Sequence, residues 1–173
     1  MSLQGVLAYS LRALRFGLLV AAAWIPLRWV RLYARTQRTN LRREGWLLVF
    51  VFYLAALTEI IALRGGALGG HPPVQWILLK TTLSQWRAGA WTFLYHTGGN
   101  LLWFLPLGWL ARKLWPGLRP VHVLLLGAGC SLGLEAAQWL LGTGVPDVDD
   151  VLLNAMGAWI GGVLRRKAVH AQN

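Results

Sequence analysis

Acidic residues, and charged residues in general, are scarce in this chain. Only 6 of its 173 residues are Asp or Glu, and charged residues of both signs make up 13% of the total. A soluble domain carries about 25% charged residues, so the chain has roughly half the usual solubilising surface. This composition excludes an ordinary soluble enzyme.

Cysteine is nearly absent as well. The one cysteine, Cys130, lies inside an apolar run, so the chain cannot form an intramolecular disulfide. Cysteine and histidine do not occur at the spacing typical of metal ligands. The sequence therefore predicts no metal site of this kind and no resident cofactor.

Long apolar runs take the place of the missing charge. Hydrophobic residues make up 56% of the chain, and the longest runs approach the ~20 residues that a membrane-spanning helix needs. Five segments stand out, namely residues 14–30, 45–63, 99–110, 121–141 and 151–164. They predict an all-α polytopic transmembrane helix bundle that forms a single membrane domain over residues 1–173. The third and fifth segments are short, so their flanking Trp, Arg and Lys are expected in the headgroup region.

The first apolar segment has two interpretations. Arg12 and Arg15 precede an apolar stretch with three alanines at positions 21–23, as in a cleavable signal peptide. The apolar character continues through residues 24–27, however, and this favours a retained helix.

The net charge of +11 predicts orientation rather than nucleic-acid binding. The basic residues flank the apolar runs instead of forming a stripe on a polar domain, so we expect no nucleic-acid partner. If the N-terminus is outside, twelve Lys and Arg lie on the inner side and five on the outer side. Positive residues concentrate on the cytoplasmic side. The charge distribution thus predicts a multi-pass cell-membrane protein with an outer N-terminus, a cytoplasmic C-terminus and membrane lipid as a partner.

The long outer loop, residues 64–97, contains a candidate interfacial helix. After a glycine-rich start, Trp76, Leu79, Leu83, Trp86 and Ala90 recur at helical spacing. This pattern is typical of a helix lying in the headgroup plane. A partly buried loop that contains tryptophans is an equally good interpretation.

Polar side chains gather at one depth, toward the predicted outer side. Five of the six acids lie there, and only Glu44 is inside. Ionisable groups near the centre of a membrane helix cost about 2.5 kcal/mol or more and mostly face the bundle interior or water. We therefore predict an outer pocket whose ligand-binding residues are His96, Asn100, Glu135, Gln138, Asp147, Asp150 and Asn154.

The spacing of these residues predicts how the last two apolar segments pack. Ser131, Glu135 and Gln138 share one helical face, and Asn154 shares another with a small-xxx-small motif at positions 157 and 161. We expect the two helices to form a hairpin whose polar stripes meet at the outer surface. A structural role is also open, because Asp149 or Asp150 can cap the last helix.

Residues 129–133, Gly-Cys-Ser-Leu-Gly, match the G-x-S-x-G hydrolase pattern. That motif requires a turn from a strand into a helix, whereas here it lies within a continuous apolar run. Its glycines are better explained by packing. A membrane-embedded serine hydrolase with His96 as base is the less favoured alternative.

Two segments resemble VanZ-like membrane proteins. Asn100-Leu-Leu-Trp-Phe-Leu-Pro-Leu-Gly108 resembles the family's N-x-x-x-F-x-P-x-G segment. The motif Glu135-Ala-Ala-Gln138, followed by Asp147-Val-Asp-Asp150 and Asn154-Ala-Met-Gly157, resembles its second segment. The resemblance implies a small multi-helix membrane protein with a VanZ-like core over about residues 45–164. The founding member of that family is associated with resistance to the antibiotic teicoplanin, which implies a role in the cell envelope.

One position departs from the family pattern. VanZ-like proteins usually have an arginine shortly before the acidic turn, where this chain has Gly144. If that arginine normally pairs with an acid or holds a phosphate, this chain must use another cation, such as Arg64 or Arg87, or the function is lost.

Three functions follow from these observations. The favoured one is a non-enzymatic envelope protein whose polar pocket binds an envelope lipid, a cell-wall precursor or a glycopeptide-related ligand. The alternative is an enzyme acting on a lipid-linked or phosphate-bearing substrate, in which Glu135, Asp147 and Asp150 hold a divalent cation and His96 acts as acid or base. A transporter is disfavoured, since no internal repeat is found and the polar groups do not lie at the midplane.

Overall fold

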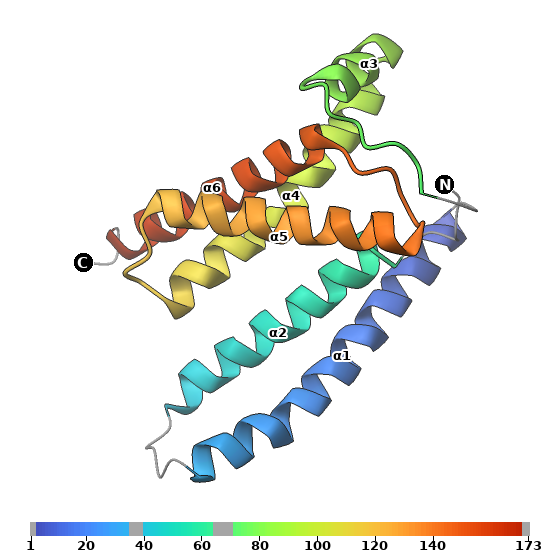
Figure 1. Ribbon diagram of the computed structural model, residues 1–173. Helices are drawn as coiled ribbons and strands as arrows, with labels where there is room; N and C mark the ends of the chain where they lie inside the picture. Colours follow the sequence, from blue (N-terminus) through green and yellow to red (C-terminus); the bar gives the residue numbers. More distant parts are fainter. Residues whose placement is uncertain (1–2, 35–39, 64–70, 171–173) are drawn as a thin grey trace. The chain divides into compact units, whose positions relative to one another are not determined.

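The computed structural model describes residues 3–34, 40–63 and 71–170, and the regular secondary structure of this part of the chain is helical apart from one isolated bridge (Figure 1). The predicted all-helical class is therefore confirmed. The six helices are α1 (Leu3–Ala34), α2 (Leu41–Ile61), α3 (Lys80–Ala88), α4 (Ala90–Leu114), α5 (Pro120–Leu141) and α6 (Val148–His170).

Three of the described helices are long and apolar enough to cross a membrane. The qualifying segments are Ser10–Ala34, Leu41–Ile61 and Pro120–Leu141. The count of five spans therefore stays a prediction. Helix α4 has 25 residues, more than the predicted segment 99–110, because residues 90–98 mix aromatic and polar side chains and so lower the local hydropathy.

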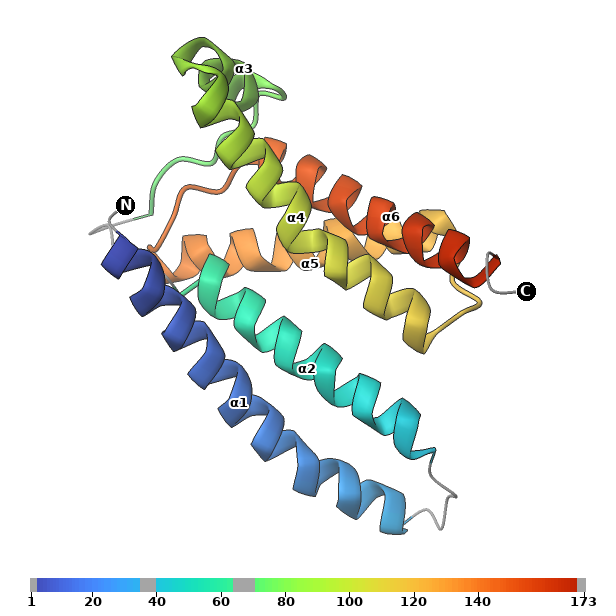
Figure 2. The same ribbon diagram turned by 180° about the vertical axis from the view of Figure 1, so that it is seen from behind.

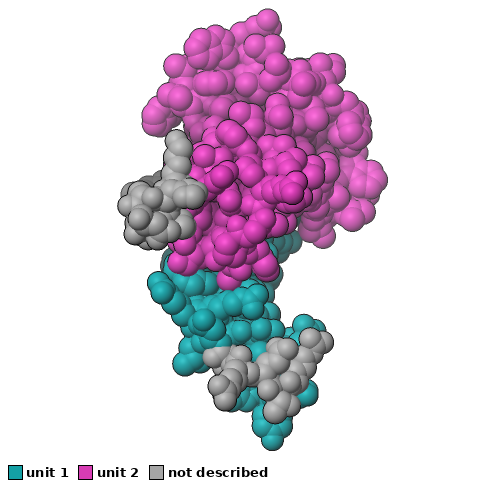
Figure 3. Space-filling view, turned by 90° about the vertical axis from the view of Figure 1, so that its left-hand side faces the viewer, with its two compact units in different colours: residues 1–64 teal, residues 65–173 magenta. Residues whose placement is uncertain are grey.

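The chain divides into two compact units, residues 1–64 and residues 65–173 (Figure 3). In the first unit, α1 and α2 form an antiparallel hairpin (Figure 2). Gly17 lets the two helices approach closely, since a Cβ there would lie 2.7 Å from Cε2 of Phe52.

Two ion pairs join the helices of this hairpin. Near one end, Arg28 donates from Nε and Nη2 to the two carboxylate oxygens of Glu44, both at 2.8 Å. Near the other end, Nη2 of Arg12 lies 2.8 Å from Oε1 of Glu59. The first pair is bidentate, the geometry in which a guanidinium binds a carboxylate best.

In the second unit, α4 and α6 pack along each other with their backbones in contact (Figures 1 and 2). Glycine makes this contact sterically feasible. A Cβ on Gly108 of α4 would lie 1.7 Å from the carbonyl oxygen of Ala158, and one on Gly161 of α6 would lie 1.9 Å from that of Leu105. The motif at 157 and 161 therefore faces α4 rather than α5.

Helix α5 also packs on α6, as predicted, but through another glycine. A Cβ on Gly127 would lie 2.6 Å from the Cβ of Ala158. The hairpin prediction was thus right about the pair of helices and wrong about which glycines join them. Spacing alone could not distinguish two neighbours on adjacent faces of one helix.

Helix α3 corresponds to the candidate interfacial helix, but it is shorter than the pattern indicates. It begins at Lys80, and Leu79 before it has a left-handed backbone with φ of 63°. None of its residues is buried in the chain itself. The preceding residues, 71–79, are called the outer segment after the side on which the sequence predicts them to lie. They run beside the α5–α6 turn, where Gln75 forms a parallel bridge with Asp147.

Candidate functional site

The acidic turn between α5 and α6 is held together by its own carboxylates. Oδ1 of Asp147 accepts a hydrogen bond from the backbone N–H of Asp149 at 2.9 Å, which makes Asp147 the cap of α6. The prediction that Asp149 or Asp150 caps this helix was therefore wrong by two or three positions.

Asp149 instead accepts hydrogen bonds from the outer segment and from α3. Its carboxylate accepts hydrogen bonds from the backbone N–H of Leu79, and from the N–H and hydroxyl of Thr82 at 2.9 and 3.0 Å. The side chain is only 1% exposed. A carboxylate at the first turn of a helix satisfies N–H groups that have no partner in the helix and favours the helix dipole.

Asp149 is not among the seven ligand-binding residues predicted from the sequence. Its partners lie 67 and 70 residues earlier in the chain, and no motif links the two segments. The only hint in the sequence is that Asp149 and Asp150 are adjacent. One helix needs only one of them as a cap, so the other is available for a different partner.

Glu135 is buried on α5 and points at the acidic turn. Its Oε2 accepts a hydrogen bond from the backbone N–H of Asp147 at 3.1 Å. Gln138, one turn further along, is also buried, and its backbone carbonyl accepts from the N–H of Thr143 at 2.9 Å. Both side chains therefore sit on the inner face of α5, as their spacing predicted.

Two amides link α6 to its neighbours. Nδ2 of Asn100 on α4 donates to Oδ1 of Asp150 at 2.6 Å. Nδ2 of Asn154 donates to the hydroxyl of Ser131 on α5 at 2.9 Å. Oδ1 of Asn154 is buried and has no hydrogen-bond partner within the described part of the chain.

His96 does not join this group. It is exposed on α4, and its ring packs edge-on against that of Tyr95 at 5.4 Å between centroids. Over residues 71–170, no hydrogen bond is found between His96 and the predicted partners Asn100, Glu135 or Asp150. The structure thus brings six of the seven predicted residues to one end of the α4–α6 bundle and leaves His96 outside.

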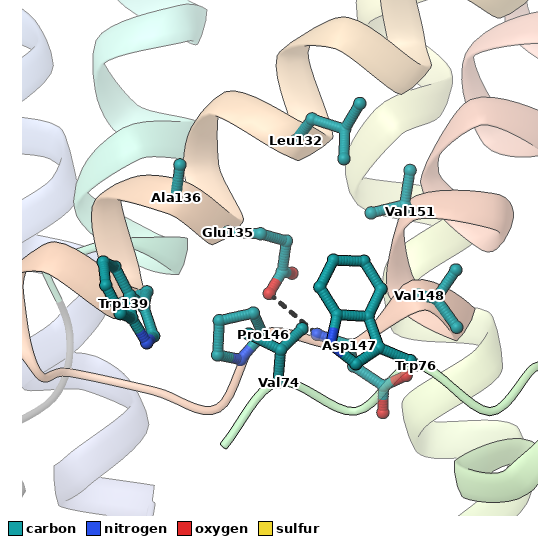
Figure 4. Close-up of a pocket in the computed structure, with 10 residues that line it drawn as sticks. All are labelled: Val74, Trp76, Leu132, Glu135, Ala136, Trp139, Pro146, Asp147, Val148 and Val151. Carbon is teal, nitrogen blue, oxygen red and sulfur yellow. Dashed lines mark hydrogen bonds between the residues drawn. The ribbon is translucent and has the colours of Figure 1, made fainter. Parts of the chain in front are cut away.

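A cavity of about 270 Å³ opens beside Glu135 (Figure 4). Its walls come from the outer segment, from α5, and from the turn and first residues of α6. In Figure 4 the Glu135 carboxylate points toward Asp147, with the Trp76 ring close by. Two acids, Glu135 and Asp147, line it together with eight largely apolar residues, namely Val74, Trp76, Leu132, Ala136, Trp139, Pro146, Val148 and Val151.

The outer segment covers this cavity, and several contacts hold it against α5 and the α5–α6 turn. The N–H of Gln75 donates to the carbonyl of Pro146 at 2.9 Å, and the N–H of Val148 donates to the carbonyl of Gln75 at 3.2 Å. Nδ1 of His71 lies 2.8 Å from the carbonyl oxygen of Trp139, and the two rings are 4.7 Å apart. His71 and Gln75 therefore hold the outer segment against the α5–α6 turn, a role that no motif in the sequence predicted.

The acids are not arranged as a metal site in the described residues. No group of three or more His, Cys, Asp or Glu there is placed so that it could hold a metal ion. The tentative set Glu135, Asp147 and Asp150 is divided between different hydrogen bonds, since Asp150 accepts from Asn100 whereas Asp147 caps α6.

Gly144 occupies the position where the family usually has an arginine. A Cβ there would lie 2.8 Å from Nε2 of Gln138, so any larger side chain would displace that amide. Of the two cations considered as replacements, Arg87 is exposed on α3, and Arg64 lies outside the described residues.

The G-x-S-x-G pattern lies in the middle of α5, so no elbow between strand and helix exists there. Ser131 is fully buried and accepts the hydrogen bond from Asn154. The glycines at 129 and 133 have open space around them, so the explanation of these glycines by packing was wrong. The serine acts as a partner for a buried amide, and the pattern is coincidental.

Comparison with known proteins agrees with the resemblance found in the sequence. Searches of curated proteins and of solved structures gave no significant match. The VanZ/LLP1 family model matches residues 46–167, well over half of the 173 residues. Together with three long apolar helices, this match places the protein in a membrane. The chain belongs to the VanZ/LLP1 family.

Proposed function

We propose that this protein binds an envelope lipid in the cavity beside Glu135, and that it does so without catalysis. The supporting observation is the cavity itself, whose lining residues are apolar apart from Glu135 and Asp147. Ligand sites are typically concave and mostly apolar, with a few polar groups that orient the ligand.

The lining favours a ligand with a hydrocarbon chain. Each methylene group removed from water contributes about 0.8 kcal/mol, and Leu132, Val148 and Val151 offer an apolar surface for such a chain. The carboxylate of Glu135 then faces the polar part of the ligand and accepts hydrogen bonds from its hydroxyl, amide or ammonium groups.

The volume limits how much of the ligand enters. A cavity of about 270 Å³ is near the lower end of small-molecule sites, so it accommodates part of one chain rather than a whole lipid. The rest of the molecule remains in the bilayer, beside the exposed face of α5, where Leu132 and Leu140 are 57% and 67% exposed.

Cell-wall precursors and glycopeptide-related ligands belong to the same proposal. A lipid-linked precursor offers both a long apolar chain and a polar group that donates hydrogen bonds. The predicted orientation, with an outer N-terminus and a cytoplasmic C-terminus, places the cavity in the outer leaflet of the cell membrane. A link to teicoplanin resistance rests on the family's founding member.

The enzymatic alternative has less support. Glu135, Asp147 and Asp149 each accept a backbone hydrogen bond that holds the turn or α3 in place. Carboxylates with these structural tasks are poorly suited to acid–base steps. Saturable binding of Mg²⁺ or Mn²⁺ to the purified protein would favour the enzyme over the lipid-binding role.

A cavity-filling pair of variants tests the proposal. Leu132 and Leu125 are both exposed leucines on α5, but only Leu132 lines the cavity. We expect Leu132→Trp to lose a lipid that co-purifies with the wild type, as measured by mass spectrometry of extracted lipids, and Leu125→Trp to retain it. Equal lipid content in the two variants would contradict the proposal.

A further inference from the structure

A second cavity lies at the opposite end of α4 and α6 from the acidic turn, and arginines dominate it. Its volume is about 550 Å³, and it is lined by Arg112, Arg165, Arg166 and the α4–α5 connection 116–120, which contributes Arg119. These residues form the arginine cavity. Four guanidinium groups around one space repel one another unless an anion lies between them.

Acids of the same unit are too far away to supply that anion. The four acids in residues 65–173 are Glu135, Asp147, Asp149 and Asp150. Glu135 follows Pro120 by 15 residues on α5, and Asp150 precedes Arg165 by 15 residues on α6, a separation of about 22 Å along each helix. That is about twice the Debye length of ~10 Å at 0.1 M salt, so these charges are largely screened from the arginines.

Two of the arginines are already positioned by the protein. Nη1 of Arg112 donates to the carbonyl of Gly162 at 3.2 Å, and the guanidinium of Arg165 lies 5.4 Å from the centre of the Trp109 ring. Nε of Arg165 is buried and has no hydrogen-bond partner among the described residues. A buried donor without a partner is costly, and rotation of the Arg165 side chain toward an anion in the cavity would give its Nε an acceptor.

We propose that the arginine cavity binds a phosphate group, with the headgroup of an anionic phospholipid as its source. Guanidinium groups match phosphate oxygens with paired, charge-assisted hydrogen bonds. The cavity lies at the ends of apolar helices, where headgroups are found, and basic pockets between membrane helices bind such headgroups. The predicted orientation puts it at the cytoplasmic face, so this site is separate from the cavity beside Glu135.

The test removes two exposed arginines that line the cavity and compares them with two that do not. Arg119→Gln/Arg166→Gln lowers the charge of the cavity by two, and Arg42→Gln/Arg43→Gln makes the same change on the exposed surface of α2. Full-length protein is placed in nanodiscs of phosphatidylcholine with increasing phosphatidylglycerol, and bound phosphatidylglycerol is counted by native mass spectrometry. Inorganic phosphate is titrated separately, with thermal stability in detergent as the readout.

We expect the cavity variant to bind phosphatidylglycerol about tenfold or more weakly than the wild type, since a charge-assisted hydrogen bond is worth at least that factor. The control variant should stay within about twofold. Stabilisation by inorganic phosphate that the cavity variant loses, without any preference for phosphatidylglycerol, would assign the phosphate to a soluble ligand instead of a lipid. If both variants bind phosphatidylglycerol equally and phosphate stabilises neither the wild type nor the variants, the arginine cavity is not an anion site.

Discussion

The helices of the two units are held together by different kinds of contact. The α1–α2 hairpin relies on two ion pairs, on buried apolar residues such as Ala55 and Leu57, and on one close approach at Gly17. The α3–α6 unit relies on backbone contact at glycines and on buried hydrogen bonds. Opposite charges meet in the first unit, whereas in the second the acids lie at one end of α5 and α6 and the arginine cavity at the other.

This difference indicates where each unit tolerates change. An ion pair between two helices can be replaced by other side chains, because it does not require contact between the helix backbones. Backbone contact at Gly108 and Gly161 leaves no room for any side chain. The second unit is therefore expected to be the more sensitive one, and its cavities depend on geometry rather than on charge pairs.

Substitution of Gly108 by leucine should have the largest effect. The added Cβ would overlap the carbonyl of Ala158, which belongs to the backbone of α6 and cannot move aside. We expect a loss of about 3 kcal/mol or more in the free energy of unfolding, or no folded protein at all. Gly99→Leu is the matched control on the same helix, because a Cβ there meets nothing within 4 Å. Thermal unfolding of both variants in detergent is the measurement, and equal stability would contradict the packing described.

Removal of the Asp149 carboxylate should release the outer segment and α3. Asp149→Ala deletes the acceptor for Leu79 and Thr82 and leaves two backbone N–H groups without their partner. The expected cost is about 2–4 kcal/mol, at about 1–3 kcal/mol for each unsatisfied group after partial access of water. Amide hydrogen exchange at 79 and 82 should accelerate strongly, while amides of α5 keep their protection. Unchanged exchange at these two positions would show that another group caps α3.

Two substitutions of Glu135 distinguish the contribution of its hydrogen bond to stability from the contribution of its negative charge. Glu135→Ala leaves the buried N–H of Asp147 without its acceptor and should cost about 1–3 kcal/mol. Glu135→Gln keeps an oxygen at the same distance and should cost less than about 1 kcal/mol. Thermal unfolding compares the two variants. If glutamine is as damaging as alanine, the negative charge of Glu135 is itself required for folding.

The smallest effect is expected in the α1–α2 hairpin. Glu44→Gln weakens the pair with Arg28, which is partly exposed, so the loss should be about 1 kcal/mol or less. The exchanged pair Arg28→Glu/Glu44→Arg should restore most of the stability. A double-mutant cycle on unfolding free energies measures the interaction. A loss larger than that of Asp149→Ala would reverse the proposed ranking of the two units.

The sequence predicted the helical class, the family and the buried faces of α5 and α6. These succeed because apolar periodicity and short-range spacing are local properties of the chain. The buried polar residues at 131, 135 and 138 recur every three or four positions, and each is buried in the structure. Such a stripe indicates a face without specifying the neighbour that covers it.

What could not be predicted depends on contacts between distant segments. The bridge between Gln75 and Asp147 and the capping of α3 by Asp149 join residues about 70 positions apart. Helix α4 extends beyond the predicted apolar span 99–110, because polar residues before position 99 continue the same helix. His96 lies one turn before Asn100, yet its exposure on α4 separates it from the cluster.

Photo-crosslinking of a lipid tests the central proposal most directly. The wild type is reconstituted with a lipid that carries a photoreactive group in its chain, and the labelled peptides are mapped by mass spectrometry. We expect labels to concentrate around Trp76, Leu132 and Val151, the walls of the cavity beside Glu135. Labels spread evenly along α5, with Leu125 modified as often as Leu132, would show that lipid only surrounds the helix and would contradict a lipid-binding cavity.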